Sequence, residues 1–130
     1  MQKTLINPWQ WQEALGYEQA VEVSHASHTL YCAGQAAMDE HGAPSAADMG
    51  GQLTLALDNI EAVLTKAGYA WHHVVRLNYL TTSMTDFFQH YGAVVGRLAQ
   101  HQFKAASTLV EVKALAMPSL LVEIEITAVK

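Results

Sequence analysis

Two glutamates near the C-terminal end, Glu123 and Glu125, are the residues of this sequence best placed to do chemistry. Apolar residues alternate with other types along this tail, so a period-2 strand would carry both carboxylates on its second face. A carboxylate in apolar surroundings holds its proton more tightly and can exchange it near neutral pH. Glu123 is therefore a candidate acid or base. The competing interpretation is a structural ion pair with Lys113 or Arg76.

The other residues of reactive type give weaker evidence of a functional site. The phenol of Tyr17 could donate a hydrogen bond to a ligand or simply cover one end of the core. Cys32 lies in an apolar run, which favours a buried and unreactive thiol. The seven histidines include no helical pair four residues apart beside an acid, so we expect no metal site. Gly50 and Gly51 are too short a run for a phosphate-binding loop.

Composition predicts one domain over residues 1–130. The chain is 51% hydrophobic and 15% charged, which allows a sizeable core, and its single cysteine cannot form an internal disulfide. No apolar run approaches the ~18 residues of a membrane span, and the N-terminus does not read as a secretory signal. We therefore expect a cytoplasmic protein without membrane contact. A net charge of −5 with only seven Lys and Arg argues against nucleic-acid partners.

Periodicity predicts the elements that must position these residues. Residues 19–24 and 29–33 alternate as strands around a polar turn, which indicates a β-hairpin. Capping-box spacing at Ser45 and Asp48 starts a helix that ends at Gly68. A strand follows over residues 72–82. Ser83 and Asp86 open a second helix to about residue 100, and two strands fill the tail from 105 to 129.

The resulting order β-β-α-β-α-β-β is of the α+β class. Each helix lies between strands and should cross over the same face of one mixed sheet, which leaves the other face bare. Both faces should need cover, because the tail strands supply apolar residues on each of them: Val110, Val112, Val122 and Ile124. We expect a homo-oligomer that buries the open face.

Four segments together resemble the reactive-intermediate deaminase family, also called Rid or YjgF: Gly16–Val21, Leu30–Gln35, Gln52–Asn59 with Ala67–Gly68, and Val122–Glu125. The resemblance covers nearly the whole chain, and its more specific parts are the Gly34–Gln35 pair and the tail motif. It implies a chorismate-mutase-like fold with two helices on one face of the sheet. It also implies a homotrimer with its sheets inward and its ligand clefts between subunits.

The resemblance further implies a cofactor-independent reaction. In the best-studied branch, water adds to the C=N bond of a 2-imino or enamine acid and ammonia leaves. Carried over by motif, the catalytic residues are Tyr17 and Glu123, with Glu123 orienting or deprotonating the water. The backbone of Ala33 and Gly34 belongs to the expected ligand site.

Two residues depart from the family's pattern. Aligning residues 110–112 with the family's strand puts Ser107 where an arginine would bind the substrate carboxylate, and Leu109 where a cysteine often stands. Losing a bidentate guanidinium contact in a half-buried cleft costs roughly 2–5 kcal/mol of binding. Arg76, Lys104 or Lys113 could supply the charge from elsewhere, but the sequence does not place them.

Two functions stay open at this point. One is hydrolytic deamination of an imine or enamine metabolite other than the usual 2-imino acids, with Ser107 and Leu109 shaping the site. The other is a non-catalytic module that binds a small metabolite in the same cleft. RNA cleavage, which is attached to the family by name, ranks last because the chain is acidic and has no basic stripe.

Overall fold

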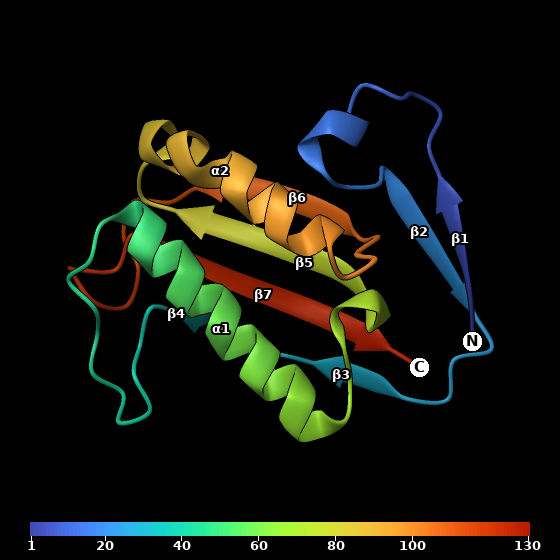
Figure 1. The fold of residues 1–130 in the computed structure, drawn as a ribbon, viewed down its shortest axis with the longest axis horizontal. Coiled ribbons are helices and arrows are strands. Elements are labelled where there is room, and N and C mark those ends of the chain that lie inside the picture. The colour runs from blue at the N-terminus through green and yellow to red at the C-terminus, as the bar shows by residue number, and fades with distance from the viewer.

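Two α-helices lie across one face of a mixed β-sheet in the computed structural model, which describes residues 1–130 (Figure 1). In chain order the elements are β1 (Gln2–Ile6), η1 (Glu13–Leu15), β2 (Ala20–Ser24), β3 (Thr29–Tyr31), β4 (Gln35–Ala36), α1 (Met49–Ala67), η2 (Trp71–His73), β5 (Val74–Thr81), α2 (Met84–Ala99), β6 (Ala106–Glu111) and β7 (Val122–Val129). The main sheet has the order β3-β7-β5-β6, and β4 also pairs with β7. The predicted α+β class with both helices on one face is confirmed.

The tail strand β7 shows the alternation that the sequence indicated. Val122, Ile124, Ile126 and Ala128 are buried and join the core formed with α1 and α2. Glu123 and Glu125 face the other side of the sheet, where Glu123 is partly buried and Glu125 is exposed. Burying one side of a central strand in this way is what fixes its register.

The predicted hairpin between residues 19–24 and 29–33 is wrong. Strand β2 pairs instead with β1 in a separate two-stranded sheet, and β3 pairs with β7. The turn between β2 and β3 leads toward the C-terminus, because the Ser27 and His28 amides both donate to the Lys130 carbonyl. Strand β1, which sequence periodicity did not mark, provides the partner that β2 requires.

The helix ends mostly follow the sequence signals. Gly68 ends α1 in a left-handed conformation with φ 76°, and the Ser83 hydroxyl accepts a hydrogen bond from the Asp86 amide at the start of α2. The start of α1 differs from the prediction. Its N-cap is Asp48, whose carboxylate accepts from the Gly51 amide, whereas Ser45 accepts from Ala47 in the preceding loop.

Strand β5 departs from simple alternation at its first residues. A bulge at Val75 separates the pairs that Val74 and Arg76 make with β7. Val74 is therefore buried on the same face as Leu77 and Tyr79, although its sequence position places it on the other face.

The face of the sheet opposite the helices remains uncovered in the single chain. Tyr31 on β3 is 80% exposed, and Val110 on β6 is 43% exposed. Val122 and Ile124, two of the residues expected to give the sheet apolar faces, are buried on the helix side. The open face still carries large hydrophobic side chains from β3 and β6.

Two amides of α1 fasten the loops around β4 and β7. The Gln52 side chain is fully buried; its Nε2 donates to the Ala47 and Ser119 carbonyls, and its Oε1 accepts from the Leu121 amide. Asn59 Nδ2 donates to the carbonyls of Ala36 and Met38, at 3.0 and 2.9 Å. These contacts hold the strand ends beside Gly34 and Glu123.

Replacing Gln52 by leucine should lower the free energy of unfolding by about 2–4 kcal/mol, because three hydrogen bonds to backbone groups are lost at about 1 kcal/mol each. Urea unfolding followed by circular dichroism measures this loss. Gln89→Leu is the matched control, since Gln89 is exposed on α2 and should shift stability by no more than about 0.5 kcal/mol. Equal losses from both variants would contradict the anchoring role of Gln52.

Candidate functional site

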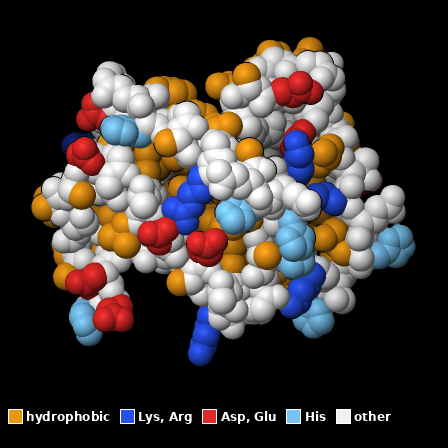
Figure 2. Space-filling view, in the orientation of Figure 1, with side chains coloured by type: hydrophobic (Ala, Val, Ile, Leu, Met, Phe, Trp, Pro, Cys, Tyr) orange, Lys and Arg blue, Asp and Glu red, His pale blue; other side chains and the backbone are white.

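A small cavity lies where the segment before β2 meets α2 and the β5–β6 pair. Its volume is about 240 Å³, and its lining brings together three of the predicted site residues, Tyr17, Ser107 and Leu109. Hydrophobic side chains flank the notch between α2 and the N-terminal segment in Figure 2. Four further residues complete the wall: Leu15, Tyr79, Phe88 and Tyr91.

Sequence patterns did not mark these four residues for a site. Tyr79 and Tyr91 fit the apolar faces of a strand and a helix, so they read as core residues. Phe88 carried a usable signal, because it falls outside the apolar stripe of α2 next to buried Phe87 and is 54% exposed. A large aromatic residue off the buried stripe indicates an exposed contact surface.

Sheet register explains why Ser107 and Leu109 share the cavity. Strand β6 pairs in parallel with β5, so that Ser107 lies beside Leu77 and Leu109 beside Tyr79. Both partners are buried under the helices. Neighbouring residues in register point to the same face, and Ser107 and Leu109 therefore face the helix side of the sheet.

A glycine turn before Tyr17 and a backbone hydrogen bond after it position this residue. Gly16 takes φ 75°, and a Cβ at this residue would lie only 2.9 Å from Val95 Cγ1, so both the backbone and the packing require glycine. On the other side, the Glu18 amide donates to the Ala105 carbonyl at 2.9 Å. The Tyr17 ring packs edge-on against Trp11, with ring centroids 6.3 Å apart.

The two buried phenols in the cavity, Tyr79 and Tyr91, stay uncharged. Burial raises the pKa of Tyr91 to about 12, with a further contribution from nearby Tyr17. Burial also holds the pKa of Tyr79 well above its ordinary value. The Tyr91 hydroxyl donates to the Leu15 carbonyl at 2.5 Å, so this hydrogen bond fastens η1 onto α2.

The remaining predicted residues, Ala33, Gly34 and Glu123, form a second group at the β4 end of the sheet. Glu123 pairs with Ala36 of β4, and a Cβ added to Gly34 would collide with the Glu123 carboxylate. Glycine is thus required for this carboxylate to lie against the backbone. The Ala33 carbonyl accepts a hydrogen bond from Gln35 Nε2 at 3.2 Å.

Neither cation considered as an ion-pair partner of Glu123 is bonded to it. Arg76 donates to the Thr108 hydroxyl at 3.0 Å, and exposed Lys113 makes no hydrogen bond or ion pair through its side chain. Glu125, by contrast, accepts from Asn78 Nδ2 at 3.0 Å. Glu125 thus has a structural partner, whereas the Glu123 carboxylate has no hydrogen-bond partner within the chain.

The two groups of predicted residues lie on opposite faces of the sheet. Ser107 shares the face of buried Leu77, while Glu123 lies beside Leu80 on the open face. Strand β5 also separates β6 from β7. A single chain therefore does not bring Glu123 to the cavity that contains Tyr17 and Ser107.

No cation compensates for the missing arginine within the chain. Arg76 faces the open side with Thr108, and Lys104 is engaged with Glu18, with Nζ 3.7 Å from Oε1. Lys113 does not line the cavity either. None of these three residues brings a positive charge to Ser107.

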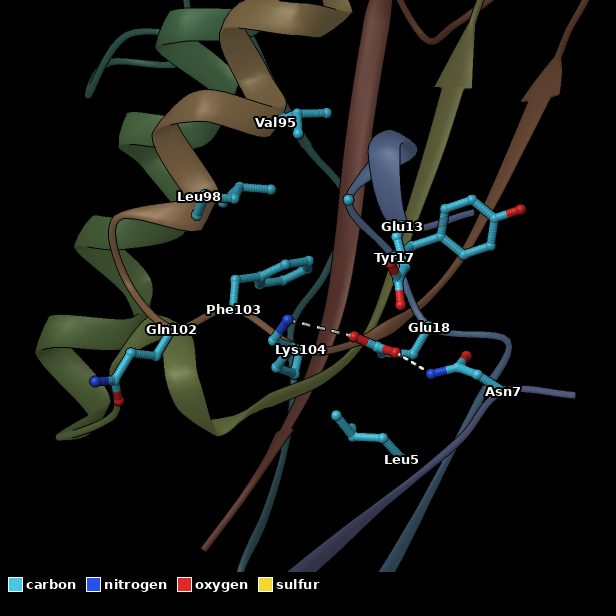
Figure 3. Close-up of a pocket in the computed structure, with 12 residues that line it drawn as sticks. Leu5, Asn7, Glu13, Tyr17, Glu18, Val95, Leu98, Gln102, Phe103 and Lys104 are labelled. Atoms are coloured by element: carbon cyan, nitrogen blue, oxygen red, sulfur yellow. Dashed lines mark hydrogen bonds and ion pairs between the residues drawn. The ribbon is translucent and has the colours of Figure 1, made fainter. Parts of the chain in front are cut away.

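A larger cavity of about 530 Å³ adjoins the first and shares Tyr17 with it (Figure 3). Its main polar feature is Glu18, which is 8% exposed and accepts one hydrogen bond from Asn7 Nδ2. Asn7 Oδ1 in turn accepts from the Gln19 amide at 2.8 Å. In Figure 3 Lys104 and Asn7 approach the Glu18 carboxylate from opposite sides. This network ties the end of β1 to the start of β2 and so supports Tyr17.

Comparisons with known proteins cover nearly the whole chain. A sequence model of the family described as Endoribonuclease L-PSP matches residues 11–130. The Schizosaccharomyces pombe protein mmf1, named as mitochondrial, is 30% identical over 130 residues, which cover 98% of this chain and 75% of that protein.

Solved structures share the fold. YyfB of Yersinia pestis, a conserved Rid-family protein of unknown function, is 32% identical with a TM-score of 0.89, and the match covers 100% of both chains. A Mycobacterium tuberculosis member of the YjgF/YER057c/UK114 family is 28% identical with a TM-score of 0.65, over 99% of this chain and 100% of that one. None of the helices of this chain combines the length and hydropathy that crossing a bilayer requires.

Proposed function

Because this chain belongs to the endoribonuclease L-PSP family, to which the Rid and YjgF proteins also belong, we propose that it forms homotrimers with small-molecule sites between subunits. One subunit provides the cavity that contains Tyr17, Ser107 and Leu109. Its neighbour provides the backbone at Ala33 and Gly34 together with the Glu123 carboxylate. The reaction at this site is hydrolytic deamination of an imine or enamine that lacks the usual carboxylate.

The observation that carries this proposal is the placement of the two groups on opposite faces of one sheet. Glu123 can reach a Ser107 cavity only if that cavity belongs to another copy of the chain. The open face offers the contact surface, since it exposes Tyr31 and Val110 and has no cover in the single chain. A closed ring of identical contacts would complete every site in the same way.

Glu123 is suited to activate water. Its carboxylate lies against Gly34 and has no cation bound to it, so it remains free to accept a proton. As a water oxygen bonds to the C=N carbon, Glu123 takes a proton from the water and passes it to the imine nitrogen. Glu123 then takes the hydroxyl proton of the resulting carbinolamine and passes it to the amino nitrogen, so that the C–N bond breaks and ammonia leaves. Overall, one imine and one water give one carbonyl compound and one ammonia.

Tyr17 lines the cavity and its hydroxyl can contact a group bound there. Its hydroxyl makes no hydrogen bond within the chain, in contrast to the Tyr91 hydroxyl, which is committed to Leu15. A phenol hydroxyl can donate a hydrogen bond to the substrate nitrogen or to the developing carbinolamine. We therefore assign Tyr17 a supporting role and Glu123 the main proton transfer.

Replacing Glu123 by glutamine should lower the rate of ammonia release by about 10²-fold or more, because the amide keeps the shape but cannot accept the proton. Imines generated in situ from benzylamine by an amine oxidase serve as substrates, and ammonia is measured against the uncatalysed rate. Glu125→Gln is the matched control on the same strand and should retain nearly native activity. Equal rates for native protein and Glu123→Gln would overturn the proposed chemistry.

The alternative is a non-catalytic module that binds a metabolite in the same cleft. The absence of the expected arginine at Ser107 favours it, because binding a different ligand would explain the change without requiring turnover. Saturable binding with no ammonia release above background, across neutral and acidic imines, would identify the protein as such a module.

RNA cleavage is not part of the proposal, although the family description names an endoribonuclease. The chain has a net charge of −5, whereas RNA binding draws its affinity from clustered cations. A cytoplasmic location stays a prediction, and the relative named as mitochondrial leaves the compartment to be tested by fractionation.

A further inference from the structure

The cavity that contains Ser107 has an uncharged lining. Of its seven residues six are hydrophobic, and Ser107 is the exception. Four of the side chains are aromatic: Tyr17, Tyr79, Phe88 and Tyr91. Placing a carboxylate here would remove it from water with no cation to compensate, which is costly.

The hydroxyl groups around the cavity offer hydrogen bonds but no charge. Tyr79 and Tyr91 keep their protons because burial raises the pKa of each phenol, to about 12 for Tyr91. The Tyr91 hydroxyl is already used by the Leu15 carbonyl. The hydroxyls of Ser107 and Tyr17 have no partner within the chain, so they remain available to a ligand.

Large hydrophobic side chains continue from the cavity to the surface. Phe88 and Leu15, both on its wall, are 54% and 38% exposed, and Trp11, whose ring packs against Tyr17, is 61% exposed. The ring of Phe88 lies edge-on to that of Tyr91, with centroids 5.9 Å apart. Aromatic walls of this kind favour edge or offset contacts with another ring.

The size of the cavity limits the ligand. An apolar cavity of about 150 Å³ is enough to hold benzene. A volume of about 240 Å³ therefore accommodates one ring with a short side chain but not a drug-sized molecule.

We propose that the ligand of this site is a small, uncharged molecule with one aromatic ring, held by Phe88 and the neighbouring rings and hydrogen-bonded by Ser107. This inference rests on the proposed function and specifies its substrate class: an aryl or arylalkyl imine without a carboxylate. Phe88 is the residue that selects for the ring.

Two isosteric probes test the ligand class without requiring turnover. Phenylacetamide and phenylacetate have nearly the same shape, but the first is neutral and the second is charged; their affinities are measured by calorimetry on the native oligomer. We expect the amide to bind at least about tenfold more tightly than the carboxylate. Phe88→Ala should weaken amide binding about tenfold through the lost ring contact, whereas Trp9→Ala, an exposed aromatic residue outside the cavity, should not.

The outcomes separate this inference from the proposed function. Phenylacetate binding as tightly as phenylacetamide, or an unchanged affinity in Phe88→Ala, would overturn the ligand class. If Glu123-dependent ammonia release persisted in that case, the proposed reaction would stand and only the selection of uncharged aromatic ligands by this cavity would be wrong. Absence of binding by both probes together with absence of turnover would reject both proposals.

Discussion

Ser107→Arg should give this chain an affinity for small carboxylates that is about 30-fold to several thousand-fold above that of the native chain. This range corresponds to the roughly 2–5 kcal/mol that a charged contact contributes in a half-buried site. The guanidinium would form a planar, bidentate contact with a carboxylate, which the serine hydroxyl cannot reproduce. The cavity of about 240 Å³ has space for the longer side chain.

The substitution also tests whether the rest of the site is intact. Phenylacetate affinity is measured by calorimetry, and ammonia release is measured with 2-imino acids generated by an amino-acid oxidase. Gln89→Arg is the control, since it adds the same charge on the exposed side of α2, next to Phe88. Increased carboxylate binding in both variants, or in neither, would contradict the assignment of Ser107 to the carboxylate position.

The alternation of residue types in the C-terminal tail correctly predicted which face of β7 is buried. Apolar residues at every second position fixed which face of β7 is buried, because a slip of one residue would have exposed Val122 and Ile124. The same alternation correctly placed Glu123 and Glu125 on the opposite face. Local signals for helix ends, at Gly68 and Ser83, were also sufficient, since caps depend only on nearby backbone groups.

Strand pairing was not predictable in the same way. Residues 19–24 and 29–33 looked like a hairpin because they are adjacent and alternate, but each found a partner distant in sequence. The bulge at Val75 likewise reverses the face of Val74 without any local signal. Such features depend on long-range packing, which periodicity does not encode.

The candidate site was only half predictable. Family resemblance predicted Tyr17, Ser107, Leu109, Gly34 and Glu123 as site residues but carried no information on which of them share a face. Sequence patterns did not indicate the aromatic lining of the cavity, because Tyr79 and Tyr91 have the same apolar pattern whether they pack in a core or line a cavity. Only the registers of β6 and β7 on β5 together reveal that Ser107 and Glu123 are on opposite sides.

Mixed oligomers test the central claim, that each site takes one half from each of two subunits. Ser107→Trp should fill the cavity, and Glu123→Gln should remove the base, so each variant alone should be inactive. The two variants are co-expressed with different tags and purified through both tags in sequence. Every mixed ring of three subunits then contains one cleft with two undamaged halves.

Ammonia release by these mixed trimers from the benzylamine-derived imine is the deciding measurement. Sites shared between subunits predict recovery to about one third of the native rate per trimer. Light scattering verifies that the purified species is a trimer, and circular dichroism verifies that both variants fold. Activity no higher than that of the two parent variants would show that Ser107 and Glu123 do not meet across an interface, and would contradict the account.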